Sequence, residues 1–119
     1  MVGVLTLEIS PAVMAAFEHD RSERTAEALA ATIRTAHPGI VNAMPDAELL
    51  ARTRAGVALS RSHGVETRRD IMILSLVHVM FGPDALHQPE LSWIGPILAE
   101  PPESPDTRAY RIHCRLAES

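Results

Sequence analysis

The spacing of hydrophobic positions along this chain predicts helices throughout. The first helical pattern begins at Ser10-Pro11, because serine caps free backbone N–H groups and proline is tolerated in the first turn. The pattern ends at Ala36, before His37-Pro38-Gly39. Its hydrophobic positions change face across the charged run 18–24, so we expect a kink or a break in that run.

Two further helices are predicted in the middle of the chain. One begins near Pro45-Asp46 and ends at Gly64, since glycine readily adopts the left-handed conformation that ends a helix. Gly56 lies on its inward stripe, and a glycine inside a helix costs about 1 kcal/mol, so we expect a close helix crossing there. The next helix runs from residue 67 to 81, and residues 71–81 are apolar around almost the whole circumference. That pattern is typical of the buried centre of a bundle.

The two ends of the chain complete the predicted fold. Residues 1–10 alternate loosely, as in a short strand or an extended arm. Residues 84–104 form a connection rich in proline and acid, with a short apolar segment around Trp93. Ser104-Pro105-Asp106 then predicts a last helix over residues 105–117. We therefore expect a single all-α domain over residues 1–119, an orthogonal bundle of four to five helices.

Composition predicts a cytoplasmic location for this domain. The chain has 119 residues, of which 46% are hydrophobic and 22% charged, values typical of one globular domain. The longest dense apolar run, 71–81, is much shorter than the ~20 residues of a membrane span, and the N-terminus does not have the pattern of a signal peptide. The single cysteine, Cys114, excludes an intrachain disulfide and suits a reducing compartment.

The distribution of charge along the chain indicates what kind of molecule the protein binds. A net charge of −4 argues against a general nucleic-acid binder. Residues 52–69 carry five arginines and one acid, whereas residues 84–106 carry five acids and no arginine. One interpretation is that the two stretches pack near each other or are simply solvated. The other is that one of them contacts an oppositely charged protein partner.

Two surfaces are candidates for contact with such a partner. Arg54, Arg61 and Arg68 form a ridge suited to an acidic protein surface. The alternative is the N-terminal segment Val2–Ile9, which can pair with a strand of the partner. We expect a protein partner and no nucleic acid or membrane span.

The search for catalytic or metal-binding residues predicts none. No histidine forms the close pair that a zinc site needs. Ser75 and His78 share a helix face, but no acid stands at helical spacing to orient the histidine. We expect the serine to bond to a backbone carbonyl and the histidine to a neighbour. The chain is therefore predicted to lack catalytic, cofactor-binding and metal-binding residues, and a small enzyme built on this pair is the rival interpretation.

One series of motifs goes beyond general helical pattern. It comprises Gly56-Val57, His63-Gly64-Val65-Glu66, Asp70-Ile71, Phe81-Gly82-Pro83-Asp84, Pro89, Trp93 and Ile97-Leu98. The series resembles a family of small, uncharacterised all-helical bacterial proteins, whose members are often encoded beside type VI secretion genes for spike proteins, toxic effectors and effector adaptors. The chain departs from the family pattern at His63, His37 and Thr25, where larger apolar or aromatic residues are usual.

The resemblance implies a fold and a role. It implies an all-helical protein that is a non-enzymatic accessory of a type VI secretion effector module and binds an effector, its adaptor or chaperone, or a spike component. The alternative is an immunity protein that neutralises a cognate toxin. A loader is expected to bind the adaptor or a non-toxic region, whereas an immunity protein is expected to bind the toxin domain and rescue cells that express it.

Overall fold

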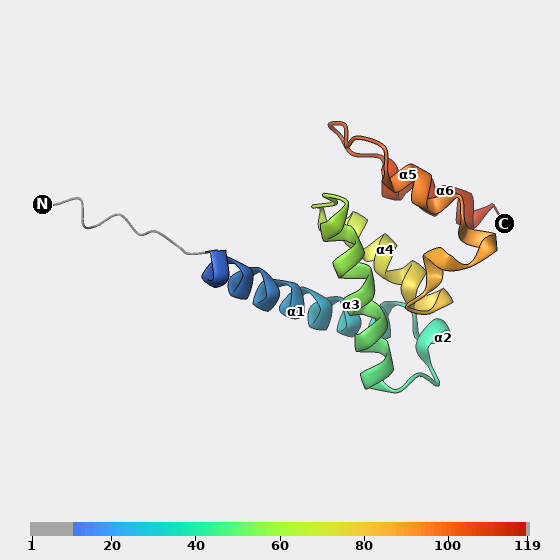
Figure 1. Ribbon diagram of the computed structural model, residues 1–119. Coiled ribbons are helices and arrows are strands. Elements are labelled where there is room, and N and C mark those ends of the chain that lie inside the picture. The colour runs from blue at the N-terminus through green and yellow to red at the C-terminus, as the bar shows by residue number, and fades with distance from the viewer. Residues whose placement is uncertain (1–10, 119) are drawn as a thin grey trace, which may run out of the picture.

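The computed structural model describes residues 11–118, and within them the chain is all helical, as predicted (Figure 1). The elements are α1 (Pro11–Ala36), α2 (Pro38–Val41), α3 (Asp46–Ser62), α4 (Arg68–Phe81), η2 (Ala85–His87), η3 (Pro89–Leu91), α5 (Ile94–Leu98) and α6 (Arg108–Ala117). The described part thus holds six α-helices rather than four to five, because α2 and α5 are single turns of four and five residues. The expected N-terminal arm over residues 1–10 lies outside the described residues.

Helix α1 is continuous, so the break expected in the run 18–24 is wrong. The segment contains no glycine or proline after Pro11, and Asp20 pairs with Arg24 one turn later at 2.7 Å, which supports a helix. Among the side chains of α1 whose burial the structure describes, the first buried one is Ala26. Figure 1 shows the N-terminal turns of α1 projecting away from the other helices. The change of hydrophobic phase therefore marks the point where the helix leaves the bundle.

Helices α3 and α4 form the centre of the structure, with the boundaries that local signals predict. Gly64 follows α3 at φ +68°, and the side chain of Thr67 caps α4 by accepting a bond from the Asp70 N–H at 3.2 Å. Six of the 14 residues of α4 are buried, whereas Arg68, Arg69 and Met80 are exposed. One side of α4 packs with α1 and α3 in two hydrophobic clusters, and its other side packs with the C-terminal segment in a third.

The C-terminal segment covers α4 with η2, η3, α5 and α6. Trp93 is half-buried against this cluster, its indole N–H donates to the Glu90 carbonyl at 3.0 Å, and Arg115 lies 4.3 Å from the ring centre. Helix α6 begins at Arg108, three residues after the expected start at Pro105. The reason is that Asp106 remains in the loop and accepts the Arg108 backbone N–H at 3.1 Å.

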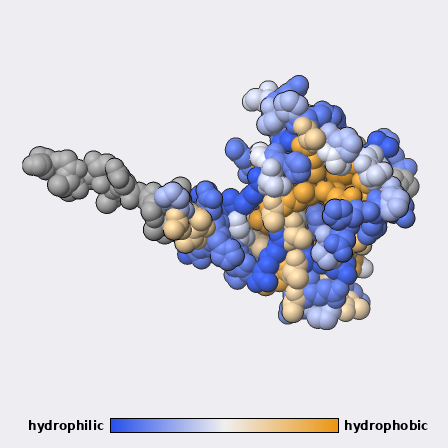
Figure 2. Space-filling model, viewed as in Figure 1, coloured by the Kyte–Doolittle hydropathy of each residue, from blue (hydrophilic) through white to orange (hydrophobic). Residues whose placement is uncertain are grey.

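The surface of this bundle carries both hydrophilic and hydrophobic residues. Figure 2 shows mainly hydrophilic residues, with a hydrophobic band over α4 and a paler stripe along α3. Ala47, Ala51 and Ala58 of α3 are exposed. None of the helices in the described range 11–118 is long and apolar enough to cross a membrane.

Candidate functional site

A surface hollow of about 630 Å³ lies where α1 passes the end of α3 and the start of α4. We call it the arginine hollow. Its lining residues are Glu18, Arg21, Thr25, Arg61, Gly64, Val65, Glu66, Arg68 and Ile71. Three separate segments of the chain thus contribute to one site, and two of the three predicted partner-binding arginines lie in it.

Local structure explains why Arg61 and Arg68 converge. Arg61 lies in the last turn of α3, and Arg68 is the first residue of α4. Between them Gly64 turns the chain, and the Val65 N–H donates to the Ser60 carbonyl at 2.8 Å. This short turn brings both arginines to the same rim. Arg21 reaches the hollow from α1, on the helix face that it shares with residues 18 and 25.

The three arginines of the hollow differ from the other arginines of the chain. Seven of the eleven arginines form ion pairs, namely Arg24, Arg34, Arg52, Arg54, Arg69, Arg108 and Arg111. Arg115 lies over the Trp93 ring. The three remaining arginines, Arg21, Arg61 and Arg68, have no carboxylate in ion-pair contact within residues 11–118, and all three line the arginine hollow.

The least exposed lining residues, which we call the floor of the hollow, are the apolar Val65 and Ile71 and the polar Thr25. Val65 is buried, and Thr25 and Ile71 are half-buried. Glu18 and Glu66 stand on the rim with the arginines, so the positive charge is interrupted by two acids. An arginine-rich rim over an apolar floor suits a ligand that combines negative charge with a hydrophobic side chain.

Arg54 has a different environment from Arg61 and Arg68. Its guanidinium donates hydrogen bonds to the Glu23 carboxylate of α1, with Nε 2.9 Å from both carboxylate oxygens. The hydrogen bond from Arg54 lowers the pKa of Glu23, and Glu23 raises the pKa of Arg54. Arg54 borders a neighbouring hollow of about 390 Å³ together with Arg61. The structure therefore brings Arg61 and Arg68 together and uses Arg54 to tie α3 to α1.

The acidic stretch 84–106 does not neutralise the basic stretch 52–69. Within the described chain no ion pair joins the two stretches, because Glu100 pairs with Arg111 at 2.9 Å and Asp106 with Arg108 at 2.8 Å. Hydrogen bonds from these arginines lower the pKa of both Glu100 and Asp106. Two of the five acids of this stretch, Glu100 and Asp106, thus pair with arginines of α6 and not with the basic stretch.

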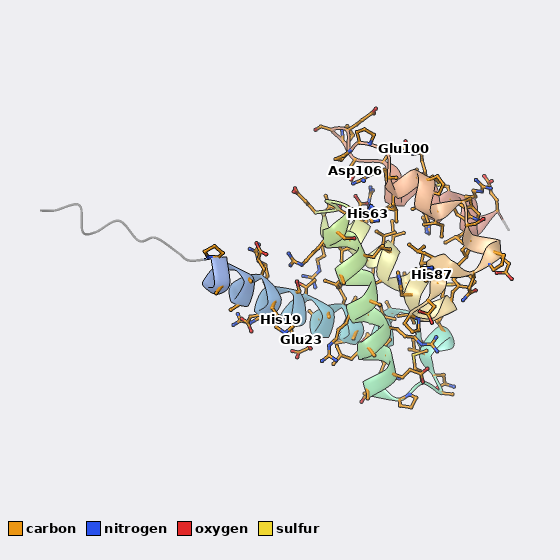
Figure 3. The ribbon with its side chains drawn as sticks, viewed as in Figure 1. His19, Glu23, His63, His87, Glu100 and Asp106 are labelled. Atoms are coloured by element: carbon orange, nitrogen blue, oxygen red, sulfur yellow. The ribbon has the colours of Figure 1, made fainter. Side chains whose placement is uncertain are left out.

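Arg108 is a structural residue that the sequence does not reveal. It is 2% exposed, and it donates to Asp106, to the Leu98 carbonyl at 2.9 Å and to the His63 carbonyl at 2.8 Å. Figure 3 shows His63, Glu100 and Asp106 close together where the end of α3 meets the loop before α6. Arg108 joins the two halves of the fold at that point.

Ser75 and His78 share a helix face but are not hydrogen-bonded to each other. His78 is buried, and its Nδ1 lies 3.0 Å from the Leu74 carbonyl oxygen, as expected of a structural histidine. The expectation for Ser75 is wrong: its buried Oγ has no hydrogen-bond partner. No group of three or more histidines, cysteines or acids in the described residues is arranged to hold a metal ion.

Comparison with known proteins identifies no relative. The sequence matches no protein-family model, and neither a curated protein nor a solved structure is detectably similar to it. The site is therefore argued from this chain's own geometry. The resemblance to proteins of secretion gene clusters stays a prediction.

Sequence reasoning missed three parts of the arginine hollow. Arg21 and the floor residues Val65 and Ile71 are absent from the predicted set. The spacing of residues 18, 21 and 25 places them on one face of α1, which is a usable signal. That face meets the end of α3 only through the crossing of the two helices, and the crossing is a tertiary feature.

Proposed function

We propose that this chain is a non-enzymatic accessory protein that binds a protein partner within a type VI secretion effector module. The partner is an effector or the adaptor that loads it, and the chain acts in the cytoplasm. The observation that carries the binding role is the arginine hollow, where Arg21, Arg61 and Arg68 have no carboxylate in ion-pair contact within residues 11–118.

The contrast within the chain supports a binding role for these arginines. Most of the other arginines are held by an acid one helical turn away or on a neighbouring element. In the hollow, two acids are close by in the lining, yet neither forms an ion pair with the arginines. Arginine is enriched among the residues that contribute most to protein interfaces, because its planar guanidinium makes several directed hydrogen bonds at once.

Three further observations support the proposed compartment, the secretion-system context and the non-enzymatic role. The single cysteine suits a reducing compartment. The secretion-system context comes from the motif series between Gly56 and Leu98. The geometry at Ser75 and His78 offers no activated nucleophile, since the histidine faces a backbone carbonyl.

Co-expression tests this proposal directly. The tagged chain is expressed with each product of its neighbouring genes, and each pair is purified and analysed for stoichiometric complex formation and a raised unfolding temperature. We expect one effector, adaptor or spike component to copurify and to stabilise the chain. If none of these products binds or stabilises it, the proposed function is wrong.

The same experiment separates a loader from an immunity protein. A loader binds an adaptor or a non-toxic region of the effector and leaves the toxin active. An immunity protein binds the toxin domain itself and restores growth to cells that express it. Rescue of growth would replace the loader assignment with the immunity alternative.

A further inference from the structure

We infer that the arginine hollow binds a short acidic segment of the protein partner, in which a carboxylate lies among Arg21, Arg61 and Arg68 and an adjacent apolar side chain rests on Val65 and Ile71. This inference rests on the proposed function and specifies its binding site. It goes beyond the predicted ridge, because it excludes Arg54 and adds Arg21 and the apolar floor.

Convergence of charge from three elements is the first argument. Arg21 comes from α1, Arg61 from the last turn of α3 and Arg68 from the start of α4. A guanidinium binds a carboxylate through two parallel N–H···O bonds, and such charge-assisted bonds are stronger than neutral ones. A carboxylate entering the hollow meets three such groups without displacing an existing ion pair of the described chain.

The position of Arg68 is the second argument. It is the first residue of α4, where the helix dipole is positive and favours an anion over a cation. Arg68 and Arg69 both stand in this first turn, and Asp70 is the acid there. A positive side chain at this position opposes helix stability, and a bound carboxylate removes that conflict by adding negative charge at the helix end.

The lining favours an acidic peptide over a nucleic acid. Glu18 and Glu66 on the rim repel a continuous phosphate backbone, and the whole chain carries a net charge of −4. A peptide presents discrete carboxylates that can avoid the two rim acids. The apolar floor and the volume of about 630 Å³ suit side chains of a peptide segment.

A defined probe tests the site without knowledge of the partner. The probe is a capped pentapeptide of sequence Glu-Leu-Glu-Leu-Glu, titrated into the full ¹⁵N-labelled chain at low salt and followed by amide chemical shifts. We expect the largest shifts at Gly64, Val65 and Ile71, and weaker binding as salt is raised. The comparison ligands are Lys-Leu-Lys-Leu-Lys, inorganic phosphate and a ten-residue oligothymidine.

Matched variants locate the effect. Arg61→Ala with Arg68→Ala removes two arginines of the hollow, and Arg24→Ala with Arg111→Ala removes two exposed arginines elsewhere with the same change in net charge. We expect the first pair to weaken peptide binding by about tenfold or more and the second pair to leave it nearly unchanged. The corresponding glutamine variants repeat the test with a longer side chain, should either alanine variant fold poorly.

The inference would be overturned by no peptide binding, by shifts that map away from the hollow, or by equal losses in both variant pairs. Phosphate or oligothymidine binding there as tightly as the peptide would also overturn it, in favour of a phosphate site. Failure here is distinguishable from failure of the proposed function. A copurifying partner that binds the Arg61→Ala, Arg68→Ala variant at full strength leaves the function standing and rejects this site.

Discussion

Gly56 on α3 lies directly against Ser75 on α4, so closely that the two backbones touch. A Cβ atom added at Gly56 would stand 2.9 Å from both the backbone nitrogen and the Oγ of Ser75, and closer still to its Cα. Glycine at this position therefore sets the distance between the two central helices. The lining segments of the arginine hollow are the end of α3 and the start of α4, so this crossing also positions Arg61 relative to Arg68.

Substitution Gly56→Ala is expected to destabilise the protein by at least ~1 kcal/mol, because the overpacking outweighs the better helix propensity of alanine. Chemical denaturation measures the free energy of unfolding. Gly95→Ala is the control, since a Cβ at Gly95 meets nothing within 4 Å. Equal stability of Gly56→Ala and the wild type would show that the helices do not cross this closely.

Substitution Ser75→Ala is expected to raise the free energy of unfolding by ~1 kcal/mol, because it removes a buried hydroxyl that has no hydrogen-bond partner. Ser60→Ala is the matched control: Ser60 is equally buried, but its hydroxyl donates to the Gly56 carbonyl at 2.8 Å. We expect that control to lose stability. If Ser75→Ala lowered the free energy of unfolding, the Ser75 hydroxyl would have a hydrogen-bond partner after all. If the substitution abolished partner binding or an enzymatic activity, Ser75 would be a functional residue.

The ion pair between Asp106 and Arg108 predicts how the free energy of unfolding depends on pH. The hydrogen bond from Arg108 lowers the pKa of Asp106 below its ordinary value of 3.8. A carboxyl whose pKa is lower in the folded state stabilises the fold fully above the unfolded pKa and loses this effect as pH falls through the folded pKa. Asp106→Asn should therefore reduce the free energy of unfolding at pH 7 and flatten its decline below about pH 4.

The control for this pH effect is Glu100→Gln. Glu100 also has a lowered pKa, but its ion pair with Arg111 is about half exposed and therefore screened by solvent. We expect a smaller change than for Asp106→Asn, measured by denaturation at several pH values. If the free energy of unfolding depended on pH in the same way for the wild type and Asp106→Asn, the ion pair between Asp106 and Arg108 would not stabilise the fold.

Charge reversal at the two rim arginines separates binding from stability. Arg68→Glu places an acid at the N-terminus of α4 and should raise stability by ~0.5 kcal/mol. Arg61→Glu places an acid in the last turn of α3 and should lower stability by a similar ~0.5 kcal/mol. Both reversals should weaken partner binding. If binding followed stability instead, rising in one variant and falling in the other, the arginines would act through the fold rather than through contact.

The central helices were predictable because their end signals are local. Thr67 caps α4 through a bond within its first turn, and Gly64 and Gly82 take positive φ angles where the helices end. The start of α6 was misplaced, because Asp106 caps Arg108 from the loop and Arg108 contacts residues far away in sequence. The continuity of α1 was missed because the change of phase reflects tertiary packing and not a helix end.

The candidate site was only partly predictable for a similar reason. Arg61 and Arg68 are separated by a short turn, so their proximity follows from local structure. The partner of Arg54, Glu23, is 31 residues away and is brought near by the crossing of α1 and α3. The same crossing adds Arg21 to the hollow. Sequence patterns indicate which residues are charged, whereas tertiary packing decides which of them remain unpaired.

The affinity of the copurified partner for two matched double variants tests the central claim most directly. Isothermal titration calorimetry compares the wild type with Arg61→Ala, Arg68→Ala and with Arg24→Ala, Arg111→Ala. The account predicts a loss of about 100-fold or more for the first pair, roughly tenfold for each arginine, and little change for the second. Equal affinity of all three proteins would show that the partner binds elsewhere and that the arginine hollow is not the interaction site.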